Sequence, residues 1–422
     1  MMHINSYWAH SRNEQKQRNI LHGEKHTDVA IVGGGFTGLS TAYHLQELGY
    51  HTTVLEQNNV GWGASGRNGS LMLVGYKKSL VDIAKKFGID TAQEMLQLSL
   101  DGIETVKAIT QKHDISCELT NAGSFCAAYK PSHLENLKRE QEFMMEKLNY
   151  ENYIVETDDV RSEINSPLYC GGMVDPNSHY FHPLNYAIGL ADAVEETGGV
   201  IYEQTPVTAI SHTNDRSVLS TPGGRITAKH VVVATNGYST DLTKRLSKTI
   251  IPMSSHMLAT EPLREETASE LIPNRRGIFD TKNILYYFRM SADHRLLFGG
   301  RIQGEESSTL YSKLRQCMLE VFPQLENARI DYTWGGLTAV TMDFFPRIGQ
   351  MQDGTYFATG YTGHGVSLST LMGKMIAHNI DQSNYGKSIL ERLPLKRIPL
   401  HSQHALILNV ATNYFRFKDQ IS

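Results

Sequence analysis

The feature that most constrains the fold of this chain is the stretch DVAIVGGGFTGLSTAYHLQELGYHTTVLE, residues 28–56. The β-branched run 28–32 predicts a buried strand, and the apolar residues after the glycines recur at helical spacing up to Gly49. HTTVLE predicts a second strand, which ends at Glu56. A strand, a G-x-G-x-x-G turn, a helix, a strand and an acidic residue together predict a βαβ unit that binds a dinucleotide.

Each residue type in this motif has a physical task. We expect Gly33 to permit the tight turn, Gly35 to let a pyrophosphate approach the backbone, and Gly38 to let the helix pack closely on the strands. The helix begins near Phe36 and Thr37, where free N–H groups and a partial positive charge face the phosphates. The motif therefore predicts a phosphate site at the helix N-terminus.

The acidic residue that ends the second strand follows the glycines at close to the usual spacing of about 20 residues. We expect Glu56 to accept hydrogen bonds from ribose hydroxyls, and we include the adjacent Gln57 in the predicted site. The alternative is a structural glycine turn, which explains less because the whole context agrees with nucleotide binding. The motif does not choose between FAD and NAD.

Composition excludes several classes of protein. The 422 residues are 40% hydrophobic and carry a formal charge of −4, so no global positive field points to nucleic acid. The four cysteines form no CxxC pair and no metal-ligand pattern, which favours free thiols in a reducing compartment. We find no secretory signal and no apolar run long enough to span a membrane. We therefore expect a cytoplasmic protein.

Two later segments extend the nucleotide fold. ITAKHVVVATNGY predicts a buried strand whose end, at Thr235, Asn236 and Gly237, closes the fold around a second loop. YFATGYTGHGVSLSTLMGKMIAH, residues 356–378, predicts a strand, a loop of small residues and a helix. The N–H groups at that helix start favour negative charge, such as the charge of a reduced flavin around N1 and C2=O.

These pieces, with VGWGASGRNGS at 60–70 and WGGLTAVTMDFFPRIG, resemble the FAD-dependent amine and amino-acid oxidases, the D-amino-acid oxidase-like family. The resemblance spans residues 28 to about 378. Within the family, GASGRNG, MLATEPL, YYFRMSADHRLLFGG and GYTGHGV are most similar to bacterial gamma-glutamylputrescine oxidoreductases. The resemblance implies an α/β fold, in which an FAD-binding Rossmann-like, doubly wound domain carries a discontinuous, sheet-rich substrate domain.

The resemblance also implies which residues contact FAD. The loop after the ribose-binding acid is expected to run along the pyrophosphate and under the isoalloxazine ring, and Val207 to bind adenine through its backbone. The implied loop residues are Gly63, Ala64, Ser65, Arg67, Asn68 and Gly69, and those at the pyrimidine edge are Gly363, His364, Gly365 and Val366. No cysteine lies in 60–70 or 331–378, so we expect FAD to be non-covalent, and we expect no metal.

The family chemistry passes a hydride from the carbon next to an amine nitrogen to flavin N5, and the imine then hydrolyses. Oxygen or another acceptor takes the electrons. The predicted substrate is gamma-glutamylputrescine or a similar small amine. The matching position for the carboxylate-binding lysine of sarcosine-type relatives is Ser367, which disfavours a sarcosine-like substrate.

Candidate catalytic residues are less constrained. On the hairpin predicted for 284–301, Tyr287 and Arg289 share one face. Arg289 or Arg301 is a candidate for holding a substrate carboxylate, against the alternative of a salt bridge. His256 is a candidate for facing the flavin, against a structural histidine. The motif itself places His364, in catalysis or in backbone packing.

Two aromatic residues also have alternative roles, one in the pocket and one in the core. Tyr287 either lines an amine channel or belongs to the core. Trp334 either walls the pocket or is an ordinary buried tryptophan. Sequence alone leaves these alternatives open.

The predicted domains are discontinuous. The FAD-binding domain comprises 27–105, 176–245 and 336–385, and the substrate domain comprises 106–175 and 246–335. The tail 386–422 is predicted to be a helix that docks on the FAD domain, with peripheral membrane contact as the alternative.

Other functions fit less well. They are a D-amino-acid or N-methyl-amino-acid oxidase or dehydrogenase, and a catalytically silent flavoprotein that acts as an assembly or binding factor. A pyridine-nucleotide reductase fits least, because no second G-x-G-x-x-G follows a strand.

Overall fold

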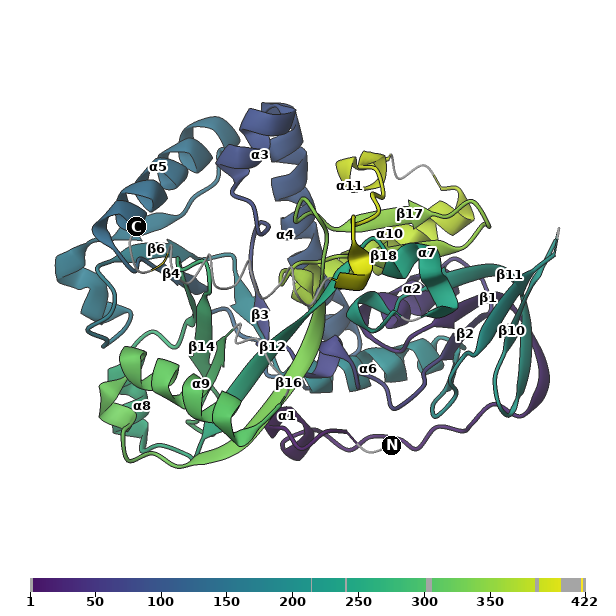
Figure 1. Cartoon of the computed structure of the whole chain (residues 1–422), viewed down its shortest axis with the longest axis horizontal. Coiled ribbons are helices and arrows are strands. Elements are labelled where there is room, and N and C mark those ends of the chain that lie inside the picture. The colour runs from purple at the N-terminus through teal and green to yellow at the C-terminus, as the bar shows by residue number, and fades with distance from the viewer. Residues whose placement is uncertain are drawn as a thin grey trace.

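The computed structural model is built around two large β-sheets that lie side by side, each with its own helices (Figure 1). The structure describes residues 3–213, 215–239, 241–300, 306–383, 387–403 and 419. Both predicted features of the fold class, the doubly wound sheet and the second sheet-rich layer, are confirmed.

The first sheet is mostly parallel, as the βαβ motif predicts. Its strands run in the order β17, β18, β11, β1, β2, β8, and an antiparallel arm of β10 and β9 extends from β11. The bounds are β1 (Gly23–Val32), β2 (Thr52–Leu55), β8 (Val200–Tyr202), β9 (Ala209–His212), β10 (Ser217–Ser220), β11 (Gly224–Val233), β17 (Arg347–Gln350) and β18 (Tyr356–Thr359). Parallel pairing of β1 with both β2 and β11 buries Val29–Val32 at the centre of this sheet.

Helices cover this sheet and bury their apolar faces against one another and against the strands. The bounds are α2 (Phe36–Glu47), α4 (Ile89–Lys112), α6 (Pro183–Glu196) and α10 (Gly365–Asp381). Helix α2 packs against α10, and α10 packs against α4. The two motif helices, which follow GGGFTG and TGHGV, therefore lie side by side and start at the same edge of the sheet.

The second sheet is largely antiparallel. Its order is β16, β12, β15, β14, β13, β4, β6, β5, and only β13 and β4 pair in parallel. The bounds are β4 (Ser124–Ala127), β5 (Tyr153–Val155), β6 (Gly172–Asp175), β12 (Ile251–Thr260), β13 (Gly277–Asp280), β14 (Tyr286–Met290), β15 (Leu296–Gly300) and β16 (Ile330–Val340). The predicted hairpin is confirmed as β14 and β15.

Shorter elements join the two layers. A small sheet of β3 (Leu71–Met72) and β7 (His179–Tyr180) lies between them. Helices of the second layer and the connections are α1 (Tyr7–His10), α3 (Leu80–Phe87), α5 (Pro131–Leu148), α7 (Lys244–Ser247), α8 (Glu265–Leu271) and α9 (Ser308–Val321).

The predicted domain limits remain a prediction. Strands of the first sheet come from 23–55, 200–233 and 347–359, and those of the second from 124–175 and 251–340. The predicted limit at 335/336 falls inside β16, which continues to Val340. A strand that continues past a domain limit has no turn or loop residues there that could mark the limit in the sequence.

Only part of the predicted tail helix can be compared with the structure. In 387–403 the chain forms α11 (Ile389–Arg392), which packs against β17 and α4, and a short turn at His401–Gln403. Residues 404–418 and 420–422 lie outside the described residues, so the docking of the whole tail and the alternative of a membrane contact stay predictions. Over the described ranges, no helix combines the length and apolar character needed to cross a membrane.

Candidate active site

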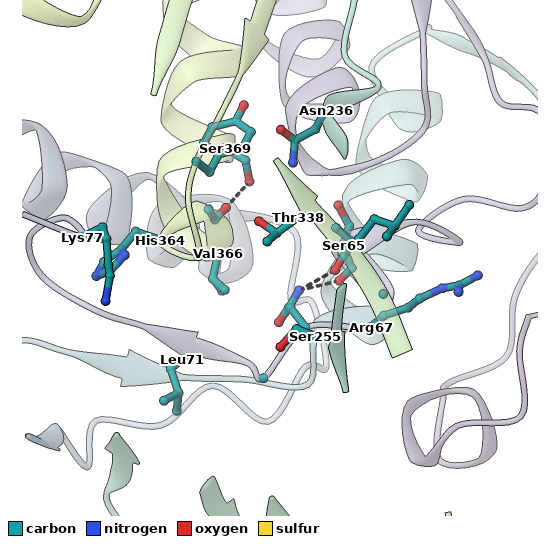
Figure 2. A pocket seen from close by; sticks show the side chains of 18 of the residues that line it. Ser65, Arg67, Leu71, Lys77, Asn236, Ser255, Thr338, His364, Val366 and Ser369 are labelled. Carbon is teal, nitrogen blue, oxygen red and sulfur yellow. Dashed lines mark hydrogen bonds between the residues drawn. The ribbon is translucent and has the colours of Figure 1, made fainter. Parts of the chain in front are cut away.

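A cavity of about 820 Å³ opens where the two sheets meet. Its walls come from the β1–α2 turn, the loop after β2, the end of β11 and the start of α10, all parts of the predicted nucleotide site, and from β16. Beyond them the cavity continues between α5, β14 and the β13–β14 loop of the second layer. Figure 2 shows Ser65 and Arg67 on one side of this space and Lys77 and His364 on the other.

Almost all of the residues predicted to contact FAD line this cavity. They are Gly33, Gly35, Phe36, Thr37, Glu56, Gln57, Gly63, Ala64, Ser65, Arg67, Asn68, Gly69, Val207, Thr235, Asn236, Gly363, His364, Gly365 and Val366. Gly38 and Gly237 do not line it. A Cβ on Gly38 would lie 2.0 Å from the Gly33 carbonyl oxygen, so this glycine serves helix packing, and Gly237 packs against Thr338 of β16.

The Glu56 carboxylate is fixed at the edge of the glycine turn. Its Oε2 accepts a hydrogen bond from the Gly34 N–H at 2.7 Å, and its Oε1 accepts one from the Asn58 N–H at 2.8 Å. Burial raises the pKa of Glu56, and these two N–H groups oppose that effect. Each carboxylate oxygen has a second lone pair, so the group can still accept from the hydroxyls of a ribose.

The start of α2 is shaped for a phosphate group. Gly33 has φ +109°, which favours glycine, and a Cβ on Gly35 would lie 2.8 Å from Ser65 Oγ. The Phe36 N–H donates to that same hydroxyl at 2.9 Å. Backbone N–H groups, a hydroxyl and a surface without side chains therefore meet at one point of the cavity wall. This donor set fits a pyrophosphate.

A second contact joins the two glycine-rich motifs. The hydroxyls of Thr37 and Tyr361 are 2.6 Å apart, and both residues line the cavity. Gly363 has φ +92°, and His364 is the N-cap of α10, so the loop TGHG turns the first N–H groups of that helix toward the cavity. The start of α10 therefore offers the partial positive charge that the sequence predicts at the pyrimidine edge.

The loop that carries Arg67 and Asn68 is held from behind by two tryptophans. The Trp334 indole N–H donates to the Arg67 carbonyl at 3.0 Å, and the Trp8 indole N–H donates to the Asn68 carbonyl at 3.0 Å. The two rings meet edge to face, with centroids 6.2 Å apart. Trp334 therefore supports the loop and does not line the cavity.

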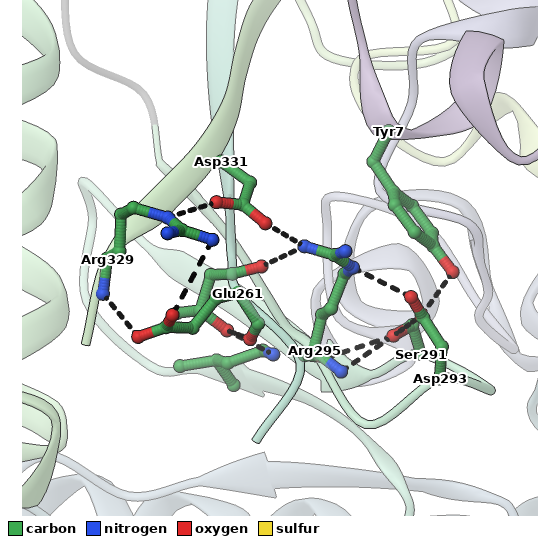
Figure 3. Close-up of polar contacts among 9 residues, drawn as sticks. Tyr7, Glu261, Ser291, Asp293, Arg295, Arg329 and Asp331 are labelled. Atoms are coloured by element: carbon green, nitrogen blue, oxygen red, sulfur yellow. Dashed lines mark hydrogen bonds and ion pairs between the residues drawn. The ribbon is translucent and has the colours of Figure 1, made fainter.

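A polar network anchors the N-terminal helix that supplies Trp8 (Figure 3). The Tyr7 hydroxyl donates to Asp293 at 2.6 Å, in the turn of the β14–β15 hairpin. Arg295 then bridges Asp293 and Asp331 at 2.7 and 2.6 Å. The hairpin of the second sheet is thereby tied to α1, which in turn supports the loop of the first.

Of the two alternatives for Tyr287, the structure favours the first, because its ring lies in the cavity wall next to the loop. A Cβ on Gly69 would lie 2.5 Å from its ring, and its hydroxyl is 2.8 Å from Ser255 Oγ. The ring thus packs on the backbone of Gly69 without an intervening side chain. Its place fits a wall of the substrate channel.

Arg289 does not fit the predicted contact with a substrate carboxylate. Its side chain is 2% exposed and lies outside the cavity lining. It donates to Ser70 Oγ, to the Met290 carbonyl at 2.8 Å and to the Phe181 carbonyl at 3.3 Å. Alternation along β14 predicts Arg289 on the same face as Tyr287. The loop at Ser70 and strand β7 cover this part of the sheet, so the guanidinium serves packing.

His256 also lies away from the predicted position. It is buried on β12, meets the Tyr311 ring edge to face at 5.9 Å, and does not line the cavity. This place fits the structural alternative. Arg301 lies outside the described residues. Ser367 is buried in α10 and does not line the cavity either.

Sequence reasoning missed the outer part of the cavity. Its walls include Lys77, Glu140, Asp280 and Lys282, and its inner part includes Tyr238 and Thr338. Glu140 lies on α5. His133, Asn136 and Glu140 recur at helical spacing there, a signal that could have marked a polar face.

Comparison with known proteins shows the family of this chain. A family model described as "FAD dependent oxidoreductase" matches residues 28–379. The chain belongs to this family of FAD dependent oxidoreductases. It is 35% identical, over 89% of its length and 88% of the other, to the gamma-glutamylputrescine oxidoreductase of Escherichia coli (strain K12). It is also 34% identical, over 99% and 98%, to a probable oxidoreductase, OrdL, of Haemophilus influenzae.

Solved structures show the same fold. Glycine oxidase from Geobacillus kaustophilus superposes with a TM-score of 0.75 at 21% identity, covering 89% of this chain and 99% of the other. L-proline dehydrogenase from P. horikoshii gives 0.73 at 19%, covering 88% and 96%. The protein is therefore an oxidoreductase, an enzyme that uses FAD as its cofactor. Its attachment to FAD without a covalent bond stays a prediction.

Proposed function

We propose that this enzyme oxidises the C–N bond of an amine, with gamma-glutamylputrescine or a similar N-substituted amine as substrate. The observation that carries the proposal is similarity to the Escherichia coli gamma-glutamylputrescine oxidoreductase along almost the whole of both chains. A cavity that continues past Tyr287 and Ser255 into a polar outer part supports it, since such a substrate is long and polar at its far end.

The described wall near the TGHG loop also favours an amine. Among the described lining residues, Arg67 is the only arginine. Its Nε donates to the Trp62 carbonyl at 2.6 Å, and its guanidinium lies 3.9 Å from the Trp62 ring centre. Its Nη1 donates to the Gly335 carbonyl at 3.3 Å, so among its nitrogens only Nη2 lacks a partner and Arg67 offers no pair of nitrogens for a bidentate carboxylate clamp. A substrate whose reacting carbon bears no carboxylate suits this wall.

The chain's own groups have distinct tasks in the proposed reaction. FAD, when bound, supplies the acceptor for the hydride that leaves the carbon next to the amine nitrogen. Gly33, Glu56 and Ser65 would hold its ribose and phosphates, and the start of α10 would face its pyrimidine edge. Tyr287 and the backbone of Gly69 would exclude water on the substrate side, so that the amine can bind uncharged. Oxygen or another acceptor then takes the electrons.

The test is an anaerobic titration of the purified holoenzyme, followed by the visible absorbance of its FAD. Gamma-glutamylputrescine, putrescine, sarcosine and D-alanine are added in separate cuvettes. We expect gamma-glutamylputrescine to bleach the band at the lowest concentration, and air with a peroxide assay then shows whether oxygen is the acceptor. Bleaching by D-alanine or sarcosine alone would overturn the proposal in favour of an amino-acid or N-methyl-amino-acid oxidase.

A further inference from the structure

The β13–β14 loop forms one wall of the outer part of the cavity, and α5 forms another. The loop residues that line the cavity are Thr281, Lys282, Asn283 and Leu285. A hydrogen bond of 2.7 Å between His133 Nδ1 of α5 and Thr281 Oγ1 joins the two walls at the start of the loop. The shape of this space therefore depends on what holds the rest of the loop in place.

The two ends of the loop are held by Asp280, the last residue of β13. Its Oδ1 accepts hydrogen bonds from the Lys282 N–H at 3.2 Å and from the Tyr286 N–H at 3.1 Å. Lys282 Nζ lies 4.4 and 4.1 Å from the ring centres of Tyr129 and Tyr286, so its side chain is held as well. These contacts leave the N–H groups of the middle of the loop to be satisfied by another part of the chain.

Asp419 supplies the acceptors for the middle of the loop. Its Oδ1 accepts from the Asn283 N–H at 2.9 Å and from Asn283 Nδ2 at 2.6 Å, and its Oδ2 accepts from the Ile284 N–H at 3.0 Å. Within the described part of the chain, neither of these N–H groups donates to a backbone carbonyl. One carboxylate thus accepts three hydrogen bonds from two consecutive residues, and an ionised acceptor makes each of them stronger than a neutral one would.

The charge of Asp419 also reaches the wall formed by α5. Burial lowers the pKa of His133, the charge of Lys130 adds to this effect, and the charge of Asp419 opposes it. Because such an influence weakens with distance, the carboxylate lies near the point where α5 and the loop meet. Asp419 is therefore placed to fix the loop beside α5, although 136 positions separate it from Asn283 in the chain.

We propose that Asp419 is a positioning residue for the substrate cavity, because it holds the β13–β14 loop in the conformation that shapes the outer part. Asp419 is not itself among the described residues that line the cavity. This role rests on the proposed function, in which the outer part receives the end of the substrate remote from the oxidised amine. It deepens that function by assigning affinity for the remote end to a contact outside the cavity.

The expected effect is on substrate affinity alone. Without the carboxylate, the Asn283 and Ile284 N–H groups lose their acceptor, and the loop spends part of its time in other conformations. The apparent Kd of the substrate then rises as the fraction of molecules with the loop in place falls. The residues predicted to contact FAD lie in the other part of the cavity, so FAD affinity and the chemistry at the flavin should change little.

The test compares the wild type with Asp419→Ala and Asp419→Asn, and with Asp159→Ala as a control at an exposed aspartate that does not line the cavity. Hydrogen exchange of the backbone amides of Asn283 and Ile284, measured by mass spectrometry on the holoenzyme, reports on the loop without any substrate. Anaerobic stopped-flow reduction by gamma-glutamylputrescine gives the substrate Kd and the limiting rate separately. Flavin fluorescence of the reconstituted apoprotein gives the FAD Kd.

We expect Asp419→Ala to speed exchange at the two amides by about tenfold or more and to raise the Kd of gamma-glutamylputrescine by about 3- to 30-fold. The limiting rate and the FAD Kd should stay within about twofold of the wild type. Asp419→Asn should lie between the wild type and Asp419→Ala, because one amide oxygen remains as an acceptor. The control should match the wild type.

Unchanged amide exchange or an unchanged substrate Kd in Asp419→Ala would overturn the proposal. A parallel loss of FAD affinity and of the limiting rate would also overturn it, because it would mean a general role in folding. Failure of the proposed function looks different, since the wild type itself would then not be reduced by gamma-glutamylputrescine while another amine reduced it. In that case the assignment to the remote end of the substrate falls, whereas amide exchange still decides whether Asp419 anchors the loop.

Discussion

The indole N–H of Trp8 donates a hydrogen bond to the backbone carbonyl of Asn68 at 3.0 Å, so a residue of the N-terminal segment supports the loop expected to lie under the flavin. Trp334 does the same for the preceding carbonyl, that of Arg67. Two segments far from the loop in sequence thus fix two consecutive peptide groups of it. This arrangement makes the N-terminal helix a support of the predicted cofactor site.

We predict that Trp8→Phe weakens FAD binding by about fivefold. The phenyl ring keeps most of the packing but leaves the Asn68 carbonyl without its donor, which costs about 1 kcal/mol. The measurement is the FAD Kd of the apoprotein, followed by quenching of flavin fluorescence, alongside the thermal midpoint.

Trp334→Phe serves as the partner variant. Because the two rings touch and the two carbonyls are adjacent, the double variant should deviate from the sum of the single changes. Full additivity, or an unchanged Kd in Trp8→Phe, would show that the loop holds its shape without the indoles.

Arg289→Met should destabilise the fold without changing substrate choice. The change removes donors from Ser70 Oγ, from the Met290 carbonyl and from the Phe181 carbonyl, and we expect a loss of about 2–4 kcal/mol in the free energy of unfolding. The ratio of kcat/KM for gamma-glutamylputrescine to that for putrescine should stay near the wild-type value. A selective loss of activity toward carboxylate-bearing substrates would return Arg289 to the role predicted from sequence.

Gly69→Ala should disturb the cavity through Tyr287. The added methyl group would lie 2.5 Å from the ring, so the ring or the loop must shift, at a cost of about 1–3 kcal/mol. We expect weaker FAD binding and slower flavin reduction. Combining the change with Tyr287→Ala should recover FAD affinity relative to Gly69→Ala alone, and an equal or lower affinity in the double variant would show that the steric conflict lies elsewhere.

Glu140 should make stability depend on pH. Its pKa in the fold, about 7, exceeds the ordinary value of 4.5, so the folded enzyme holds a proton that the unfolded chain releases between these values. The free energy of unfolding of the wild type therefore falls as pH rises through this window. The charged or titratable groups around Glu140 are Asp82 of α3 and Cys126.

Glu140→Gln removes this effect, so it should gain about 1–2 kcal/mol relative to the wild type between pH 5 and pH 8, after allowance for partial exposure. Urea unfolding at pH 5, 6, 7 and 8 measures the difference, with Glu146→Gln as the control. A constant difference across this range would contradict the raised pKa.

Much of the FAD site could be predicted from the sequence because its parts are local. The turn GGGFTG needs its glycines where its backbone lies against Ala234 and Ser65, and Glu56 needs only the end of the next strand to reach Gly34. Such requirements involve only a few consecutive residues. The same holds for TGHGV, whose loop and helix start follow one strand.

The substrate side could not be predicted in this way. Alternation along β14 correctly placed Tyr287 and Arg289 on one face. Tyr287 reaches the cavity, whereas Arg289 is covered by Tyr180 of β7 and by Ser70. In the sequence, Glu140 is one of many charged residues on an amphipathic helix. Only the fold places the β13–β14 loop opposite it.

The sequence by itself determined the βαβ unit, the two helix starts that line the cavity and the hairpin, because each depends on contacts between residues close along the chain. Only the tertiary structure decided which polar side chains meet in the cavity, which serve packing, and that Trp8 supports the flavin loop. Those outcomes depend on contacts between residues tens to hundreds of positions apart, and burial and charge at such contacts are set by how the layers pack.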